Sequence, residues 1–192
     1  MKYKVVEIFH SIQGEGALMG KPVTFVRLAG CNLSCAWCDT KESWDERNAE
    51  VYREEEIVAA VRFPWVIITG GEPAIYDLEP LIDRLHAQNH MVGIETNGTL
   101  PVSEKLDWVA CSPKPPKYEV NTRFDELKYV VDDDFNFDKI DRRFLGASEP
   151  IWLQPQGFDM QKSMSKAYNI VMNNCVSNLR VGLQLHKVYK VQ

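Results

Sequence analysis

Three cysteines lie within eight residues of one another, in the segment Gly30-Cys-Asn-Leu-Ser-Cys-Ala-Trp-Cys-Asp39. Cys31, Cys35 and Cys38 have the spacing C-x3-C-x2-C. A cubane iron–sulfur cluster contains four irons, and each protein thiolate holds one of them. Three closely spaced thiolates therefore leave one iron without a protein ligand, where a small molecule can bind and react. The spacing favours catalysis at an iron–sulfur cluster over simple electron carriage.

Two other cysteine chemistries are weighed against this one. A zinc site needs four ligands. The fourth would have to come from a distant residue, namely Cys111, Cys175, His10, His86, His90 or His186. A disulfide framework is disfavoured because the five cysteines are an odd number and nothing in the sequence indicates secretion. Zinc stays open as the alternative on spacing alone.

The composition is that of an ordinary globular protein. The 192 residues are 45% hydrophobic and 26% charged, which suits one domain over residues 1–192. The formal net charge of −5 argues against bulk nucleic-acid binding. The N-terminus lacks the apolar core of a signal peptide, and no apolar run approaches the roughly 20 residues that cross a bilayer. We expect a protein of the reducing cytoplasm, with no membrane or nucleic-acid partner.

Strand and helix patterns alternate along the chain. Strands are expected at residues 23–28, 65–69, 91–96, 106–111, 127–131, 151–154 and 179–185. Helices are expected over residues 54–61, 77–88, 137–144 and 160–173. Such alternation predicts a parallel α/β sheet, and the chain is shorter than the about 250 residues of a complete eightfold barrel. The predicted fold is an incomplete, open parallel α/β barrel, with a flat doubly wound sheet as the alternative.

Polar segments follow the expected strands at their carboxyl ends, where parallel α/β folds collect their chemistry. The cysteine loop follows the strand at 23–28. Later strands end in Thr69-Gly-Gly-Glu-Pro73, Glu95-Thr-Asn-Gly98, Ser112-Pro-Lys114 and Gln154-Pro-Gln-Gly157. Five such segments on one rim predict a shared cavity.

These segments also carry a resemblance. The cysteine motif followed by Gly70-Gly-Glu-Pro73 resembles the radical S-adenosylmethionine (SAM) enzymes. Further segments in the same order narrow the match, namely Gln13-Gly-Glu-Gly16, Cys38-Asp-Thr40, Glu95-Thr-Asn-Gly-Thr99, Ser112-Pro-Lys114, Leu153-Gln-Pro155 and His186. Together they resemble the 7-carboxy-7-deazaguanine synthases, a family of ring-contracting lyases in queuosine precursor biosynthesis. The resemblance runs from about Phe9 to the last residue.

The resemblance implies a 4Fe-4S cluster on Cys31, Cys35 and Cys38, with SAM chelating the open iron. The reduced cluster then generates a 5′-deoxyadenosyl radical, so that the cofactor carries the difficult chemistry and the protein orients it. The residues implied in SAM binding are Trp37, Cys38, Asp39, Gly71, Ser112, Pro113, Lys114, Gln154, Pro155 and Gln156.

The implied substrate is 6-carboxy-5,6,7,8-tetrahydropterin, and the implied product is 7-carboxy-7-deazaguanine, formed with loss of ammonia and regeneration of SAM. No side chain is assigned a catalytic role, because the radical itself abstracts the hydrogen. The implied substrate-binding residues are Ile12, Gln13, Gly14, Arg27, Thr69, Glu95, His186 and Gln192.

The chemistry of Arg27, Glu95 and Thr40 bears on the roles that the resemblance implies for them. The Arg27 guanidinium can hold a carboxylate in a two-pronged pair, although a solvent-facing arginine is the alternative. Glu95 interrupts an apolar strand, where a carboxylate needs a partner unless it faces water. The resemblance also implies that Thr40 binds Mg²⁺ together with substrate oxygens, and the alternative is a threonine that caps the end of the cysteine loop.

The resemblance further implies a homodimer and an electron donor such as flavodoxin or ferredoxin. Two rival functions stay open, a glycyl-radical enzyme activase and a non-enzymatic iron–sulfur carrier. The polar segment 41–53 is short, so we expect a loop where relatives have a helix. Cys111 and Cys175 are expected to be ordinary cysteines.

Overall fold

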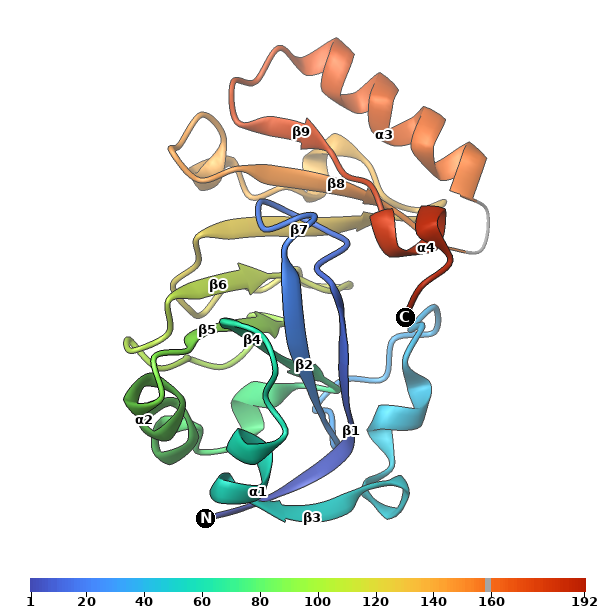
Figure 1. The fold of residues 1–192 in the computed structure, drawn as a ribbon. Coiled ribbons are helices and arrows are strands. Elements are labelled where there is room, and N and C mark those ends of the chain that lie inside the picture. The colour runs from blue at the N-terminus through green and yellow to red at the C-terminus, as the bar shows by residue number, and fades with distance from the viewer. Residues whose placement is uncertain (158–159) are drawn as a thin grey trace.

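A computed structural model of the chain describes residues 1–157 and 160–192, which build one curved nine-stranded sheet (Figure 1). The strands are β1 (Lys2–Ile12), β2 (Pro22–Leu28), β3 (Glu50–Arg53), β4 (Trp65–Gly70), β5 (Met91–Thr96), β6 (Trp108–Cys111), β7 (Glu126–Val131), β8 (Ile151–Pro155) and β9 (Leu179–Val181). Their spatial order is β3-β1-β2-β4-β5-β6-β7-β8-β9.

From β2 to β9 every neighbouring pair of strands is parallel. Because these strands lie side by side in chain order and the sheet curves without closing (Figure 1), the predicted open α/β barrel is confirmed for this part of the sheet. β1 and β3 extend it by antiparallel pairing, β1 on β2 and β3 on β1, and neither was predicted. β1 was missed because lysine, glutamate and histidine interrupt its apolar residues, which hides the alternation typical of a strand.

The helices are α1 (Glu54–Ala59), α2 (Glu79–Ala87), α3 (Met160–Asn174) and α4 (Leu185–Tyr189). The helix predicted over residues 137–144 is wrong, since two short 3-10 turns lie there (Phe137–Lys139 and Arg142–Phe144). The side chains of Asn136 and Asp141 cap these turns and separate them. The strand predicted over 179–185 is too long, because α4 begins at Leu185.

The segment 41–53 holds two 3-10 turns (Lys41–Trp44 and Glu46–Asn48) before it enters β3. As expected, no α-helix forms over residues 41–53. The end of the predicted loop, however, forms strand β3. Because this segment stays close to the end of β2, the cysteine loop packs against it, and the Gly30 N–H donates to the Ser43 carbonyl at 2.7 Å.

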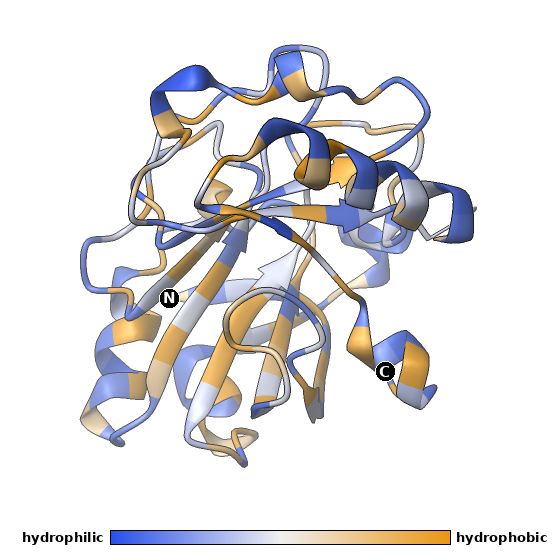
Figure 2. Ribbon diagram, turned by 90° about the horizontal axis from the view of Figure 1, so that it is seen from above, coloured by the Kyte–Doolittle hydropathy of each residue, from blue (hydrophilic) through white to orange (hydrophobic). Residues whose placement is uncertain are grey.

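The core lies against the sheet in two main clusters. α2 buries Leu81, Ile82 and Leu85 against one cluster, and Ala167 of α3 packs into the other beside Leu153. Seen from above, hydrophobic and hydrophilic residues alternate along several strands (Figure 2). This alternation lets one face of the sheet pack on helices while the other carries polar side chains. Within the described ranges, no helix is long and apolar enough to cross a membrane.

Candidate functional site

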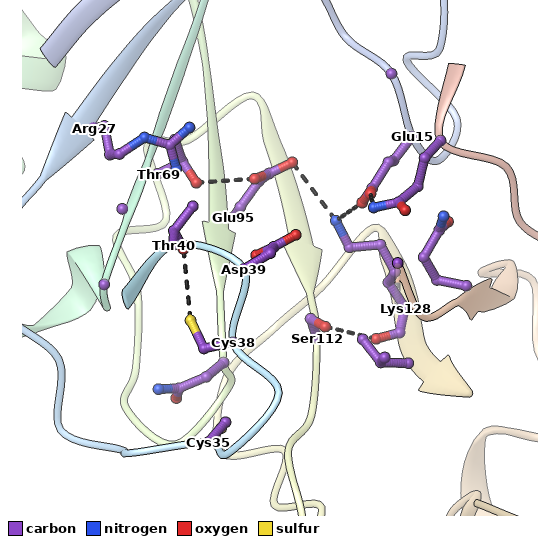
Figure 3. Close-up of a pocket in the computed structure, with 18 of the residues that line it drawn as sticks. Glu15, Arg27, Cys35, Cys38, Asp39, Thr40, Thr69, Glu95, Ser112 and Lys128 are labelled. Atoms are coloured by element: carbon purple, nitrogen blue, oxygen red, sulfur yellow. Dashed lines mark hydrogen bonds and ion pairs between the residues drawn. The ribbon is translucent and has the colours of Figure 1, made fainter. Parts of the chain in front are cut away.

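A cavity of about 530 Å³ opens at the carboxyl ends of the parallel strands (Figure 3). All five polar segments that follow strands contribute to its wall, as the topology predicts. The predicted site residues on the wall are Ile12, Gln13, Gly14, Arg27, Cys31, Cys35, Trp37, Cys38, Asp39, Thr40, Thr69, Gly71, Glu95, Ser112, Lys114, Gln154, Pro155, Gln156, His186 and Gln192. Pro113 is buried and lies outside the wall.

The cysteine loop presents its three thiols to this cavity. Cys31, Cys35 and Cys38 are each partly exposed, and the loop is closed by a turn in which the Cys38 N–H donates to the Cys35 carbonyl at 3.1 Å. The Leu33 N–H donates to the Cys31 Sγ at 3.4 Å. Burial raises the pKa of the Cys31 and Cys35 thiols, so iron binding must displace their protons.

The set of donors fits a cubane with one open iron. Among the described residues, no three His, Cys, Asp or Glu side chains converge on a single point, as a mononuclear zinc site requires. A cubane instead places each thiolate on a different iron. Cys111 is fully buried, its pKa raised to about 12 by burial, and neither it nor the exposed Cys175 lies on the cavity wall.

The Gly70-Gly71 turn packs directly against the cysteine loop. A Cβ on Gly71 would lie 2.0 Å from the Gly30 carbonyl oxygen, and the Glu72 N–H donates to that oxygen at 2.8 Å. Gly70 has a φ of +134°, which favours glycine. Two adjacent glycines are therefore required to bring the end of β4 beside the cysteines.

Glu72 fixes the same turn to the next strand. Its buried carboxylate accepts hydrogen bonds from the Ala74 N–H, the Thr96 hydroxyl and the Asn97 N–H. Burial raises the pKa of Glu72, and these hydrogen bonds oppose the shift. The carboxylate thereby ties the carboxyl ends of β4 and β5 together at the cavity.

Arg27 lies in the cavity wall, with its side chain only 15% exposed, so the solvent-facing alternative is wrong. Its Nε donates to the Glu7 Oε1 at 2.7 Å, and the other Glu7 oxygen accepts from the Gln192 Nε2 at 2.6 Å. Within the described part of the chain, the terminal guanidinium nitrogens of Arg27 have no such partner and remain available to a ligand.

Glu95 is held by three neighbours, as Figure 3 shows in part. The Thr69 hydroxyl donates to its Oε2 at 2.9 Å, and the Gln13 Nε2 donates to its Oε1 at 3.1 Å. The Lys128 ammonium lies 3.6 Å from the same Oε1. Glu95 is therefore a partnered carboxylate on the cavity wall and not a strand residue that simply faces water.

The sequence interpretation missed several residues of the wall. Glu15, Trp44, Lys128, Gln184 and Lys187 lie there. Lys128 interrupts an apolar strand in the same way as Glu95. A charged residue in such a strand needs a partner, and this pattern in the sequence could have identified Lys128 as a site residue.

A second group of side chains surrounds Lys114. Its ammonium donates to the Ser112 hydroxyl at 2.6 Å and lies 5.5 Å from the centre of the Trp37 ring. Burial and the neighbouring Lys128 lower the pKa of Lys114, against the opposing pull of Cys35 and Asp39. The charge, the ring and the hydroxyl together form a polar pocket wall beside the cysteines.

Gln154 is 2% exposed, and neither its side-chain oxygen nor its nitrogen has a hydrogen-bond partner within the described residues. A buried amide without partners is costly. Because Gln154 lies on the cavity wall, a bound ligand is the natural source of these hydrogen bonds.

The C-terminal segment folds back onto the loop between β1 and β2 (Figure 1). The Leu185 N–H donates to the Gly14 carbonyl at 2.8 Å, and a Cβ on Gly14 would lie 2.0 Å from the His186 Nδ1. Near the end of the chain, the Gln192 carbonyl accepts a hydrogen bond from the Ser11 hydroxyl. His186 and Gln192 thus reach the cavity although they are far from Arg27 in sequence.

Thr40 lies next to the cysteine loop, with its hydroxyl 3.6 Å from the Cys38 Sγ. Its side chain makes no capping hydrogen bond to the following 3-10 turn, so the alternative of a capping threonine is wrong. Its backbone carbonyl accepts instead from the Ser43 hydroxyl at 2.7 Å, which leaves the Thr40 hydroxyl on the cavity wall.

Comparisons with known proteins agree with this geometry. The model of the radical SAM superfamily matches residues 25–114. A 7-carboxy-7-deazaguanine synthase from Bacteroides thetaiotaomicron is 38% identical over the full length of both chains. One from Synechocystis is 34% identical over all of this chain and 95% of that protein. The crystal structure of QueE from Escherichia coli superposes with a TM-score of 0.80 at 30% identity, and the match covers 97% of this chain and 95% of that one.

Proposed function

The chain belongs to the 7-carboxy-7-deazaguanine synthase family of the radical SAM superfamily, and we propose that it converts 6-carboxy-5,6,7,8-tetrahydropterin to 7-carboxy-7-deazaguanine with loss of ammonia. The observation that carries this proposal is a single cavity that joins three cysteine thiols to a guanidinium and a partnered carboxylate. The thiols suit an iron–sulfur cluster, and the charged pair suits a small acid with a hydrogen-bonding ring.

Each end of the cavity has a separate task in this proposal. Cys31, Cys35 and Cys38 hold the 4Fe-4S cluster, and the wall around Lys114 and Gln154 holds SAM. When bound, the cluster and SAM supply a 5′-deoxyadenosyl radical beside the substrate. The protein contributes binding, orientation and exclusion of water.

At the other end, the free nitrogens of Arg27 pair with the substrate carboxylate in a two-pronged contact. Glu95 accepts hydrogen bonds from the ring N–H and amino groups, while Thr69 and Gln13 keep its oxygens in place. His186 and the C-terminal Gln192 close the pocket from the loop side. These contacts hold the ring at a fixed distance from the cysteine loop.

The two rival functions receive less support. An activase acts on a large protein and needs no carboxylate pocket, whereas Arg27 and Glu95 lie inside a cavity that the C-terminal segment helps to enclose. An iron–sulfur carrier needs a fourth cluster ligand, and the cavity wall, within the described residues, carries no fourth cysteine. The full-length relatives likewise favour the synthase.

The test is anaerobic reconstitution followed by mass spectrometry of the products. Reduced protein with SAM and the tetrahydropterin carboxylate is expected to yield 7-carboxy-7-deazaguanine. A glycyl-radical protein offered instead of the pterin is expected to remain unactivated. A protein that yields no deazaguanine but activates the glycyl-radical protein contradicts the proposal.

We propose further that the enzyme forms a homodimer in the cytoplasm and takes electrons from a flavodoxin or ferredoxin. Family membership supports all three. Exposed apolar side chains on one side of α3, namely Met164, Tyr168 and Met172, support the dimer because a second subunit would cover them. Light scattering of the purified protein is expected to give twice the mass of the 22.0 kDa chain.

Mg²⁺ is proposed to bind at Thr40, together with substrate oxygens. Magnesium keeps most of its waters and takes few protein ligands, so one hydroxyl suits a site that is completed by the substrate. Thr40→Ala is expected to lower kcat/KM by about tenfold and to weaken its dependence on Mg²⁺, in line with the loss of one metal ligand. Steady-state kinetics over a Mg²⁺ titration measures both effects, and unchanged turnover with unchanged Mg²⁺ dependence contradicts the assignment.

A further inference from the structure

Lys128 lies at the centre of a charge cluster in the cavity, and the proposed reaction has so far given no task to Lys128 or to its buried partner Glu15. We propose that Lys128, held in place by Glu15, is a positioning residue that sets the orientation of the Glu95 carboxylate toward the substrate ring. The inference rests on the proposed function, because it concerns the group that binds the pterin. Glu15, Lys128 and Glu95 are called the lysine cluster below.

The three members of the lysine cluster come from different elements and meet across the cavity (Figure 3). Glu15 lies on the loop between β1 and β2, Lys128 on β7 and Glu95 on β5. The Lys128 Nζ donates to the Glu15 Oε2 and lies 3.6 Å from the Glu95 Oε1. The Lys128 and Glu15 side chains are only 11% and 14% exposed, so water screens this contact weakly.

Glu15 is fixed from its other side by the C-terminal segment. Its Oε1 accepts a hydrogen bond from the Gln184 Nε2 at 2.7 Å. The Gln184 oxygen accepts in turn from the Lys187 Nζ at 2.7 Å. Because both oxygens of Glu15 are occupied, its carboxylate cannot turn away, and the position of Lys128 follows from it.

Lys128 and Glu15 stabilise each other's charged forms. Burial alone would lower the pKa of Lys128, but the carboxylates of Glu15 and Glu95 outweigh it and raise that pKa. Burial alone would raise the pKa of Glu15, but its contacts with Lys128 and Gln184 outweigh it and lower that pKa. Lys128 therefore remains a cation between two partners, with the buried Glu126 as a more distant third acid.

The shared cation explains how Glu95 can face a ligand. Thr69 and Gln13 already bind its two oxygens, and Lys128 attracts it without forming a close pair, because Glu15 holds the ammonium at a shorter distance. Without Lys128, two carboxylates would face each other across the cavity with no cation between them. Without the charge on Glu15, Lys128 would be free to close onto Glu95 and compete with the substrate.

The test measures binding of pterin-6-carboxylate, a stable and fluorescent oxidised analogue of the substrate, to the reconstituted protein. Lys128→Met is expected to raise its Kd about 30-fold, in the range seen when one partner of a buried charge pair is removed. The Kd for SAM, measured in the same samples, is expected to change less than about twofold.

The matched control is Lys105→Met. Lys105 also contacts two carboxylates, Glu79 at 2.8 Å and Asp83 at 2.7 Å, but it is 47% exposed on the outer surface. Both dissociation constants are expected to stay at their wild-type values in this variant.

A second variant separates positioning from general structural support. Adding Glu15→Gln to Lys128→Met removes one of the two uncompensated carboxylates and keeps the oxygen that accepts from Gln184. The double variant is expected to recover about threefold to tenfold of the lost pterin affinity, since coupled residues give non-additive effects. If Lys128 and Glu15 served only as structural supports, the double variant would bind the pterin more weakly than Lys128→Met does.

If Lys128→Met does not fold, Glu15→Gln alone decides the question. It is expected to raise the KM for the pterin about tenfold with little change in kcat. The positioning role is overturned by any of three results: unchanged pterin binding in Lys128→Met, equal losses of SAM and pterin binding in that variant, or an unchanged KM in Glu15→Gln. The proposed function is still upheld in these cases if the wild-type protein binds the pterin. If the wild-type protein itself does not bind the pterin, the proposed function and this inference both fail.

Discussion

Replacing Cys35 by Ala is expected to lower product formation by at least about 10³-fold, because SAM cannot be held and activated once the cluster is lost. Cys35 lies between the other two cysteines of the loop, on the cavity wall that Lys114 also lines. With only two thiolates left, the loop cannot hold a cubane, since each thiolate holds one iron. The same loss is expected at Cys31 and Cys38.

The measurement combines three readings on anaerobically reconstituted protein: iron and sulfide content, cluster absorbance, and release of 5′-deoxyadenosine from SAM. Cys175→Ala is the matched control, because Cys175 is exposed and lies outside the cavity wall. It is expected to match the wild-type protein in all three. A Cys35→Ala protein that keeps a full cluster and cleaves SAM would contradict the assignment of the ligands.

Replacing Glu95 by Gln is expected to lower kcat/KM for the pterin by about 10²-fold. Glutamine has nearly the same shape but presents one N–H₂ group where the substrate N–H groups need an acceptor, and hydrogen bonds to a charged group contribute about 1.5–3 kcal/mol each. The substitution would also take the carboxylate charge away from its three neighbours, the Gln13 and Thr69 donors and the Lys128 cation. The effect is expected chiefly in KM.

Steady-state kinetics and direct SAM binding separate this effect from general damage. Glu79→Gln, on the exposed contact with Lys105, is the control and is expected to leave kcat/KM unchanged. The Kd for SAM is expected to remain at the wild-type value in both proteins. A wild-type KM in the Glu95→Gln enzyme would contradict the assignment of Glu95 to the substrate site.

The sequence predicted the parallel part of the sheet because its strands are short apolar runs, such as Trp65–Gly70, that end in glycine or polar turns. It also placed the cysteine loop at the rim of a cavity, since carboxyl ends of parallel strands share one edge. It could not predict β1, whose pairing with β2 is decided by tertiary contacts rather than by a clear alternation.

On the cavity wall, too, some residues were predictable from the sequence and others were not. Cys31 was found from residue type and spacing, and Arg27 from the family resemblance, which its guanidinium chemistry suits; both lie on the wall. Glu15 and Lys128 were missed, although both are nearly buried there. They lie 113 positions apart in the chain, and only the folding of the β1–β2 loop onto β7 brings the two charges together.

The most direct test of the account is the electron paramagnetic resonance spectrum of the reduced, anaerobically reconstituted protein, recorded with and without SAM. Three cysteine ligands predict about four irons per chain, a 4Fe-4S signal, and a clear change of that signal when SAM is added, because SAM binds the iron that the three cysteines leave open. A protein that carries zinc, or a cluster whose spectrum is indifferent to SAM, would contradict it.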